Sequence, residues 1–128
     1  MLLRTVLRVF VVDDMSTSRG LLLQALDVLG IAKVSCAADG ETAWAALRHD
    51  PSDLVLSDLH MAGMSGLDLL GRLRNDPCTK ACRFVLVTAS PAAAAICGAS
   101  TYIPDGIVSK PFTPVQLRDC IETVVGPL

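Results

Sequence analysis

Blocks of apolar residues alternate along the chain with segments whose apolar positions recur at helical spacing. Short, nearly continuous apolar runs, which are typical of buried strands, occur at 9–12, 54–56, 84–87 and 107–108, and a further short strand is predicted at 33–36. Helices are predicted where apolar residues lie three and four positions apart: from Ser16 to about Gly30, and at 41–47, 67–74, 92–96 and 113–125. The pattern therefore predicts five strands alternating with five helices.

The strands are apolar at successive positions, which indicates that both of their faces are buried. Such strands are typical of a parallel sheet that helices cover on both sides. The segment from Gly98 to Gly106, with Pro104 inside it, is predicted to be irregular. No linker, repeat or low-complexity stretch interrupts the pattern, so residues 1–128 are expected to form a single α/β domain of the doubly wound kind.

Composition narrows the class of protein. The chain has 128 residues, of which 52% are hydrophobic and 19% charged, which favours a folded core over disorder. The formal net charge of −2, without a basic run, argues against direct nucleic-acid binding. No apolar stretch approaches bilayer length, and the N-terminus lacks a cleavage signal, so neither membrane insertion nor export is expected. Five scattered cysteines fit a reducing, cytoplasmic setting.

Polar residues stand where the predicted strands end. Asp13 and Asp14 follow the first strand, Asp58 the third, Thr88 the fourth and Lys110 the fifth. In a parallel sheet these ends share one edge, where open α/β sheets bind their ligands. We therefore expect these five side chains to converge, with Asp58 as the candidate reactive residue.

The chemistry of this set points to phosphate. Three carboxylates held close together repel one another, and a divalent cation would relieve that repulsion. Mg²⁺ prefers oxygen ligands and combines carboxylates with phosphate oxygens. The hydroxyl of Thr88 and the ammonium group of Lys110 add donors for an anion. The set predicts a Mg²⁺-dependent phosphoryl-transfer site.

Four motifs lie at these strand ends: VVDD at 11–14, SDLHMAGMSG at 57–66, TAS at 88–90 and SKPF at 109–112. On these motifs the sequence resembles the response-regulator receiver domain of two-component signalling, over essentially the whole chain. The stretch DMSTSR at 14–19 resembles the stand-alone, chemotaxis-type receivers. The resemblance implies a flavodoxin-like sheet with strand order 2-1-3-4-5.

The resemblance also implies a role for each site residue. Asp58 is the phosphoacceptor, which receives a phosphoryl group from a histidine kinase or phosphotransfer protein. Asp13, Asp14, Asp58 and the backbone carbonyl of His60 hold Mg²⁺. Thr88 follows the phosphoryl group as a switch hydroxyl, and Lys110 pairs with it across a cis bond to Pro111. Such a protein is a switch that assists its own phosphorylation and dephosphorylation, not an enzyme with a separate substrate, and it acts through a downstream protein partner.

Some positions depart from the family pattern. Ile107 stands where the family usually has the switch aromatic, three residues before the lysine, and Ala62 replaces a common proline. Tyr102 lies too far from position 107 to substitute for the aromatic and is interpreted as a packing or interface residue. These departures leave open an alternative function, a phosphorylation-independent adaptor that a partner binds constitutively.

An enzymatic alternative comes from the phosphatases of the haloacid-dehalogenase type. These enzymes also combine a strand-end aspartate with Mg²⁺, threonine and lysine, but they need an acid two residues after the nucleophile. Asp13 is followed at that spacing by Met15, and no cap insertion is present. The phosphatase interpretation is therefore disfavoured.

Overall fold

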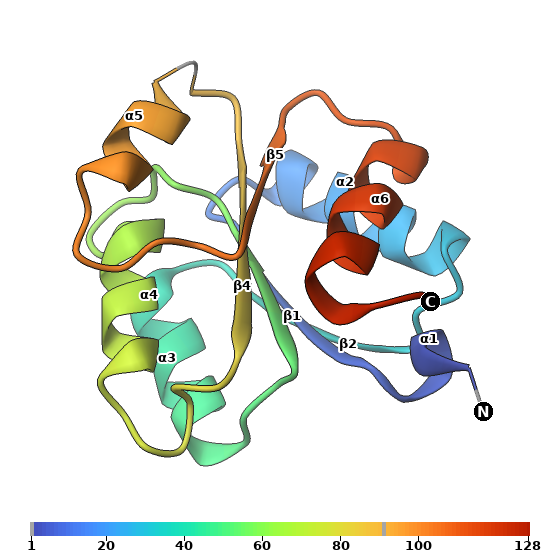
Figure 1. Cartoon of the computed structure of the whole chain (residues 1–128), viewed down its shortest axis with the longest axis horizontal. Helices are drawn as coiled ribbons and strands as arrows, with labels where there is room; N and C mark the ends of the chain where they lie inside the picture. The colour runs from blue at the N-terminus through green and yellow to red at the C-terminus, as the bar shows by residue number, and fades with distance from the viewer. Residues whose placement is uncertain (1, 91) are drawn as a thin grey trace.

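The structure is a computed structural model that describes residues 2–90 and 92–128. Its centre is a sheet of parallel strands, in the spatial order β2-β1-β3-β4-β5 (Figure 1). The strands are β1 (Arg8–Val12), β2 (Lys33–Ala37), β3 (Leu54–Ser57), β4 (Arg83–Thr88) and β5 (Gly106–Ser109). Both the five strands and their predicted order are confirmed.

Helices occupy the connections between the strands. They are α1 (Leu3–Val6), α2 (Ser16–Val28), α3 (Gly40–His49), α4 (Gly66–Arg74), α5 (Ala93–Gly98) and α6 (Pro114–Val125). The described residues thus contain six helices, one more than the sequence pattern predicts. Pro91, expected as the first residue of the helix at 92–96, lies outside the described residues.

The additional helix, α1, is a single turn before the first strand. Its N-cap residue, Leu2, makes no side-chain capping bond, and the Leu7 amide closes the turn by donating to the Leu3 carbonyl at 2.8 Å. Leu7 is buried in the core and Leu3 packs against it. Because so short a helix is not stable through propensity alone, packing onto the sheet holds it, and an apolar periodicity could not reveal it.

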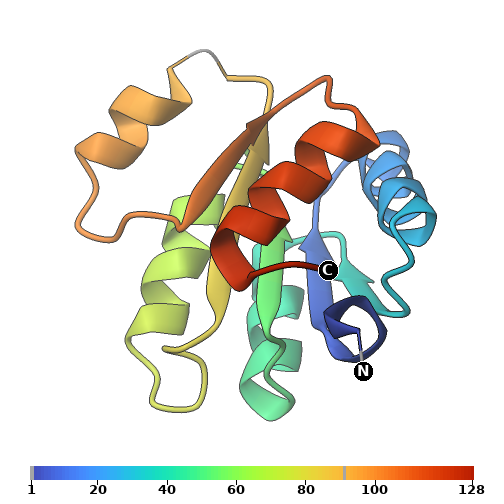
Figure 2. The same ribbon diagram turned by 45° about the vertical axis from the view of Figure 1, so that its right-hand side comes forward.

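The sheet separates two layers of helices, as both ribbon views show (Figure 1, Figure 2). Successive strand residues point to opposite faces. Val9 and Val11 of β1 therefore belong to the core beneath α2 and α6, whereas Phe10 and Val12 belong to the core beneath α3, α4 and α5. Both faces of the central strands are buried, which explains their continuous apolar sequence.

Gly66 lets α4 begin directly on the loop that follows β3. Its amide donates to the Leu59 carbonyl at 2.9 Å. A Cβ atom at position 66 would lie 2.3 Å from the backbone oxygen of Asp58, so only glycine fits here without displacing that loop. The Ser65 hydroxyl and the Asp68 carboxylate complete a capping box at the same helix end. The start of α4 thereby fixes the chain around Asp58.

Crossing a bilayer takes a long, apolar helix, and none of the helices in the described part of the chain is of that kind.

Candidate functional site

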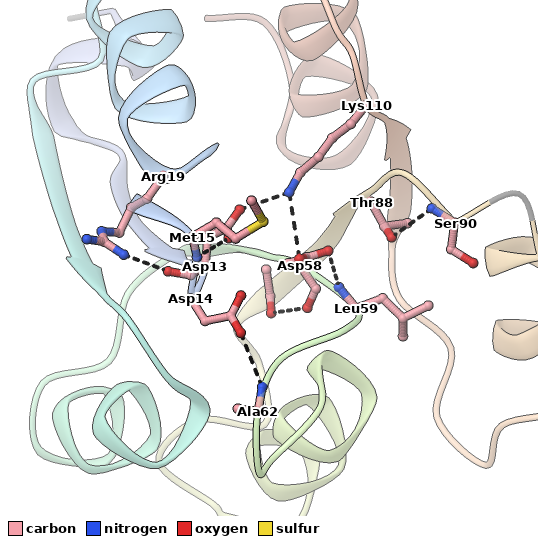
Figure 3. Close-up of polar contacts among 11 residues, drawn as sticks. Asp13, Asp14, Met15, Arg19, Asp58, Leu59, Ala62, Thr88, Ser90 and Lys110 are labelled. Carbon is pink, nitrogen blue, oxygen red and sulfur yellow. Dashed lines mark hydrogen bonds and ion pairs between the residues drawn. The ribbon is translucent and has the colours of Figure 1, made fainter. Parts of the chain in front are cut away.

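The register of the sheet brings the predicted site residues to one edge. Asp13 continues the β1–β2 ladder, since its amide donates to the Ala37 carbonyl at 3.2 Å. The amide of Asp58 donates to the Val12 carbonyl at 3.0 Å, and that of Lys110 to the Thr88 carbonyl at 3.0 Å. Each of these residues therefore stands at the carboxyl end of its strand, level with its neighbours (Figure 3).

Three carboxylates form a cluster at this edge. Asp13, Asp14 and Asp58 each offer a carboxylate oxygen, and these oxygens all lie within 4.8 Å of one another. Asp13 and Asp58 are buried, whereas Asp14 is exposed. The cluster therefore combines two desolvated acids with one that solvent reaches.

Asp13 is the most enclosed member. Its Oδ1 accepts a hydrogen bond from the Met15 amide at 3.0 Å, and its Oδ2 accepts one from Lys110 Nζ at 2.9 Å. Burial by itself would raise the pKa of the Asp13 carboxyl. Hydrogen bonds from Ser18, Lys110 and Met15, together with the charge of Lys110, outweigh burial and lower this pKa below its usual value. Asp13 is therefore ionised at neutral pH.

Lys110 faces two of the acids. Its Nζ lies 2.9 Å from Asp13 Oδ2 and 3.7 Å from Asp58 Oδ2, and the side chain is only 18% exposed. The peptide bond between Lys110 and Pro111 is cis, as the family resemblance implies. The lysine thus supplies a partly buried positive charge beside Asp58.

Asp58 is held by its own turn. Its Oδ1 accepts a hydrogen bond from the Leu59 amide at 2.8 Å, and its backbone oxygen accepts one from the Ser57 hydroxyl at 2.9 Å. Its other carboxylate oxygen, Oδ2, faces Lys110 (Figure 3). The side chain is therefore fixed on one side and faces a cation on the other.

The turn after Asp58 also contacts Asp14. The Ala62 amide donates to Asp14 Oδ2 at 3.2 Å. A proline at position 62 would have no N–H and could not make this bond. The departure from the family pattern at Ala62 thus adds a direct contact between the β3–α4 turn and the acidic cluster. His60, whose carbonyl is expected to face the metal, belongs to the same turn and has an exposed side chain.

Thr88 is buried at the end of β4 and pairs in register with Ser109 of β5. Its Oγ1 accepts a hydrogen bond from the Ser90 amide at 3.2 Å, so the hydroxyl is bound to the loop that follows β4. Its role as a switch hydroxyl stays a prediction.

Among the residues that touch the site without having been predicted, Arg19 carries a charge. Arg19, in the first turns of α2, donates from a guanidinium nitrogen to the backbone oxygen of Asp13 at 2.8 Å (Figure 3). Its position six residues after Asp13 places it within reach of the strand end. The only available signal was a positive residue shortly after two acids, at the start of a helix.

The fold and the site together define a doubly wound α/β protein that gathers acids, a hydroxyl and a lysine at the carboxyl edge of its sheet, where open sheets of this kind bind their ligands. The family model of the response regulator receiver domain matches residues 9–122. The chain belongs to this family, whose CheY-type members act in two-component signalling.

Relatives and solved structures agree with this placement. The chain is 36% identical over 122 residues to a probable chemotaxis protein CheY of Rhizobium etli, covering 95% of each chain. It is 35% identical over 118 residues to the chemotaxis protein CheY of Pseudomonas aeruginosa, covering 92% of this chain and 95% of that one. The structure of the chemotaxis response regulator CheY4 of Vibrio cholerae superposes with a TM-score of 0.81, at 27% identity, over 93% of this chain and 98% of that one.

Position 107, where the family usually has the switch aromatic, carries an isoleucine. Ile107 is 39% exposed on β5. Tyr102 packs against the core on the α3, α4 and α5 side, and its hydroxyl donates to Asn75 Oδ1 at 3.0 Å. The interpretation of Tyr102 as a packing residue is confirmed.

Proposed function

We propose that this chain is a phospho-accepting response regulator. Asp58 receives a phosphoryl group in a Mg²⁺-dependent reaction, from a histidine kinase or a phosphotransfer protein, and phosphorylation changes the binding of a downstream protein partner. The observation that carries the proposal is the convergence of three carboxylates within 4.8 Å, with Lys110 Nζ beside Asp13 and Asp58.

The donor set fits magnesium. Asp13, Asp14 and Asp58 would hold the ion together with the carbonyl of His60, and hard oxygen donors of this kind suit Mg²⁺. The contacting cation in the described structure, Lys110, balances only part of the charge of three carboxylates. When bound, the ion would neutralise the carboxylates and the oxygens of the incoming phosphoryl group.

Asp58, Lys110 and Thr88 would have different roles in phosphoryl transfer. A carboxylate oxygen of Asp58 attacks phosphorus, and the bond between phosphorus and the donor atom breaks as the new P–O bond forms. The donor atom leaves with its electron pair. Lys110, already 3.7 Å from Asp58 Oδ2, would donate to the phosphoryl oxygens, and Thr88 stands at the adjacent strand end. Positioning and charge neutralisation supply the catalysis.

The output would pass through α5, β5 and the loop between them, because Thr88 leads directly into this segment. Ile107 in place of an aromatic indicates that the relay differs in detail from the family pattern. The adaptor alternative explains Ile107, but it gives no reason for the acidic cluster and its lysine.

Intact-mass spectrometry after incubation with a small acyl phosphate and Mg²⁺ tests the phosphorylation step. We expect the mass to increase by one phosphoryl group. The increase should be absent in Asp58→Asn and when Mg²⁺ is removed with a chelator. The matched control is Asp27→Asn, because Asp27 is exposed near the C-terminal end of α2, and this variant should be phosphorylated like the wild type.

Two results would contradict the proposal. Phosphorylation of Asp58→Asn to the same extent as the wild type would move the acceptor to another residue. No phosphorylation from either the acyl phosphate or a phosphorylated histidine-containing transfer protein, in a chain that binds Mg²⁺, would favour the adaptor.

A further inference from the structure

Asp13 and Asp14 are joined by one peptide group, so a rotation of this group would move the backbone from which both carboxylates project. The amide of Asp13 is held by the β1–β2 ladder, through the Ala37 carbonyl. Its carbonyl lies beyond the end of β1 at Val12, where the ladder offers no further partner. This carbonyl accepts its hydrogen bond from Arg19 at 2.8 Å.

Arg19 is suited to this contact by its place in the fold. It lies in the first turns of α2, where its own amide donates to the Met15 carbonyl at 2.9 Å, so its backbone is fixed. The side chain is partly buried and reaches back to the strand end (Figure 3). Within residues 2–90 and 92–128, no carboxylate lies within ion-pair distance of its guanidinium group. Its described hydrogen bond is therefore to a backbone oxygen, not to an acid.

We infer that Arg19 is a positioning residue for the metal site: it fixes the peptide between Asp13 and Asp14 so that both carboxylates point toward Asp58. The inference rests on the proposed function, because it concerns the affinity of the same site for Mg²⁺. Groups that orient metal ligands without touching the ion typically change metal affinity about 10- to 100-fold when they are removed.

A positioning role and a purely electrostatic role of Arg19 predict opposite changes in Mg²⁺ affinity when the residue is replaced. A positive charge beside three carboxylates disfavours a bound cation, so removal of that charge alone would strengthen Mg²⁺ binding. Loss of a hydrogen bond that aims the carboxylates would weaken Mg²⁺ binding. The direction of the change in affinity therefore separates the two roles without reference to phosphorylation.

The test is a calorimetric titration of the full chain with MgCl₂ at constant ionic strength. We expect Arg19→Met, which removes both charge and donors, to bind Mg²⁺ about tenfold more weakly than the wild type. Arg19→Gln removes the charge but keeps an N–H donor, so its Mg²⁺ affinity should lie between those of Arg19→Met and the wild type. Arg83→Met is the matched control, because Arg83 begins β4 at the opposite edge of the sheet and is exposed. It should bind Mg²⁺ like the wild type.

Unfolding by urea without Mg²⁺ shows how far each variant is folded before titration. If Arg19→Met does not fold, Arg19→Gln decides, because its affinity falls under the positioning role and rises under the electrostatic one. Unchanged or tighter Mg²⁺ binding in folded Arg19 variants, beside a wild type that binds Mg²⁺, would overturn this inference alone. A wild type that does not bind Mg²⁺ would overturn both the inference and the metal dependence of the proposed function.

Discussion

Lys110 hydrogen-bonds to Asp13, not to Asp58: its Nζ lies 2.9 Å from Asp13 Oδ2 and 3.7 Å from Asp58 Oδ2. The lysine thus stabilises a buried acid while it faces the expected phosphoacceptor. Removal of one partner of a buried pair leaves the other charge incompletely compensated.

Lys110→Met is therefore expected to destabilise the fold. A hydrogen-bonded charged partner that is left unsatisfied typically costs about 1–3 kcal/mol of unfolding free energy. Urea denaturation at pH 7 without Mg²⁺ measures this loss. The control is Lys80→Met, since Lys80 is exposed in the turn before β4 and should change stability little. Equal effects of the two substitutions would contradict the prediction.

The pKa of Asp13 predicts a pH dependence. A carboxyl group whose pKa is lowered on folding stabilises the folded state above its unfolded pKa of about 3.9. This contribution is lost as the pH falls through the lower, folded-state pKa. The unfolding free energy of the wild type minus that of Asp13→Asn should therefore be larger at pH 6 than at pH 3. Acids far from Asp13 titrate alike in both proteins, so their contributions cancel. A difference that is constant or larger at pH 3 would show that Asp13 has no lowered pKa.

Gly66 and Gly20 provide a matched pair of glycine-to-alanine substitutions. A Cβ atom at position 66 would lie 2.3 Å from the Asp58 carbonyl oxygen, whereas one at position 20 would meet no atom of the described residues within 4 Å. Gly66→Ala should destabilise the fold by about 1–3 kcal/mol or more through overpacking. Gly20→Ala, in the exposed interior of α2, should stabilise it by about 0.5–1 kcal/mol. Thermal unfolding of the two variants checks both signs.

Tyr102 and Asn75 are expected to be energetically coupled. The Tyr102 hydroxyl donates to Asn75 Oδ1, while the Asn75 side chain donates to the Gly71 carbonyl at 2.7 Å. In a double-mutant cycle of Tyr102→Phe and Asn75→Ala, the coupling energy should be about 0.5–1.5 kcal/mol, the usual net value of a hydrogen bond. Additive effects in urea denaturation would indicate that the loop before β5 is not fastened to α4 through this bond.

Continuous apolar runs and strand-end polar residues were sufficient to predict the sheet and the place of its site. Val9 to Val12 and Phe84 to Val87 are apolar at every position because helices cover both faces, so the parallel sheet was visible in the sequence. Asp58 and Lys110 were predicted to converge because carboxyl ends of parallel strands share an edge, and the register confirms that they do.

Features held by single tertiary contacts were not predictable from the pattern. Helix α1 consists of one turn held by packing of Leu7, and so short a segment has no periodicity to detect. The contacts of Arg19 with the Asp13 carbonyl and of Ala62 with Asp14 depend on backbone groups, which every residue carries and no sequence pattern distinguishes.

The pair formed by Lys110 and Asp13 joins residues 97 positions apart, with four of the five strands, from β2 to β5, between them in the sequence. The acids that follow β1 and β3 therefore gain their lysine only when the last strand has docked, so a partly folded chain lacks the complete set of site residues. An ion or phosphoryl group that binds the complete site binds only the folded sheet. Binding therefore stabilises the folded state as a whole and makes the opening of strands far from the site less frequent. Amide hydrogen exchange in β2, remote from Lys110, should accordingly slow when the acidic edge is loaded.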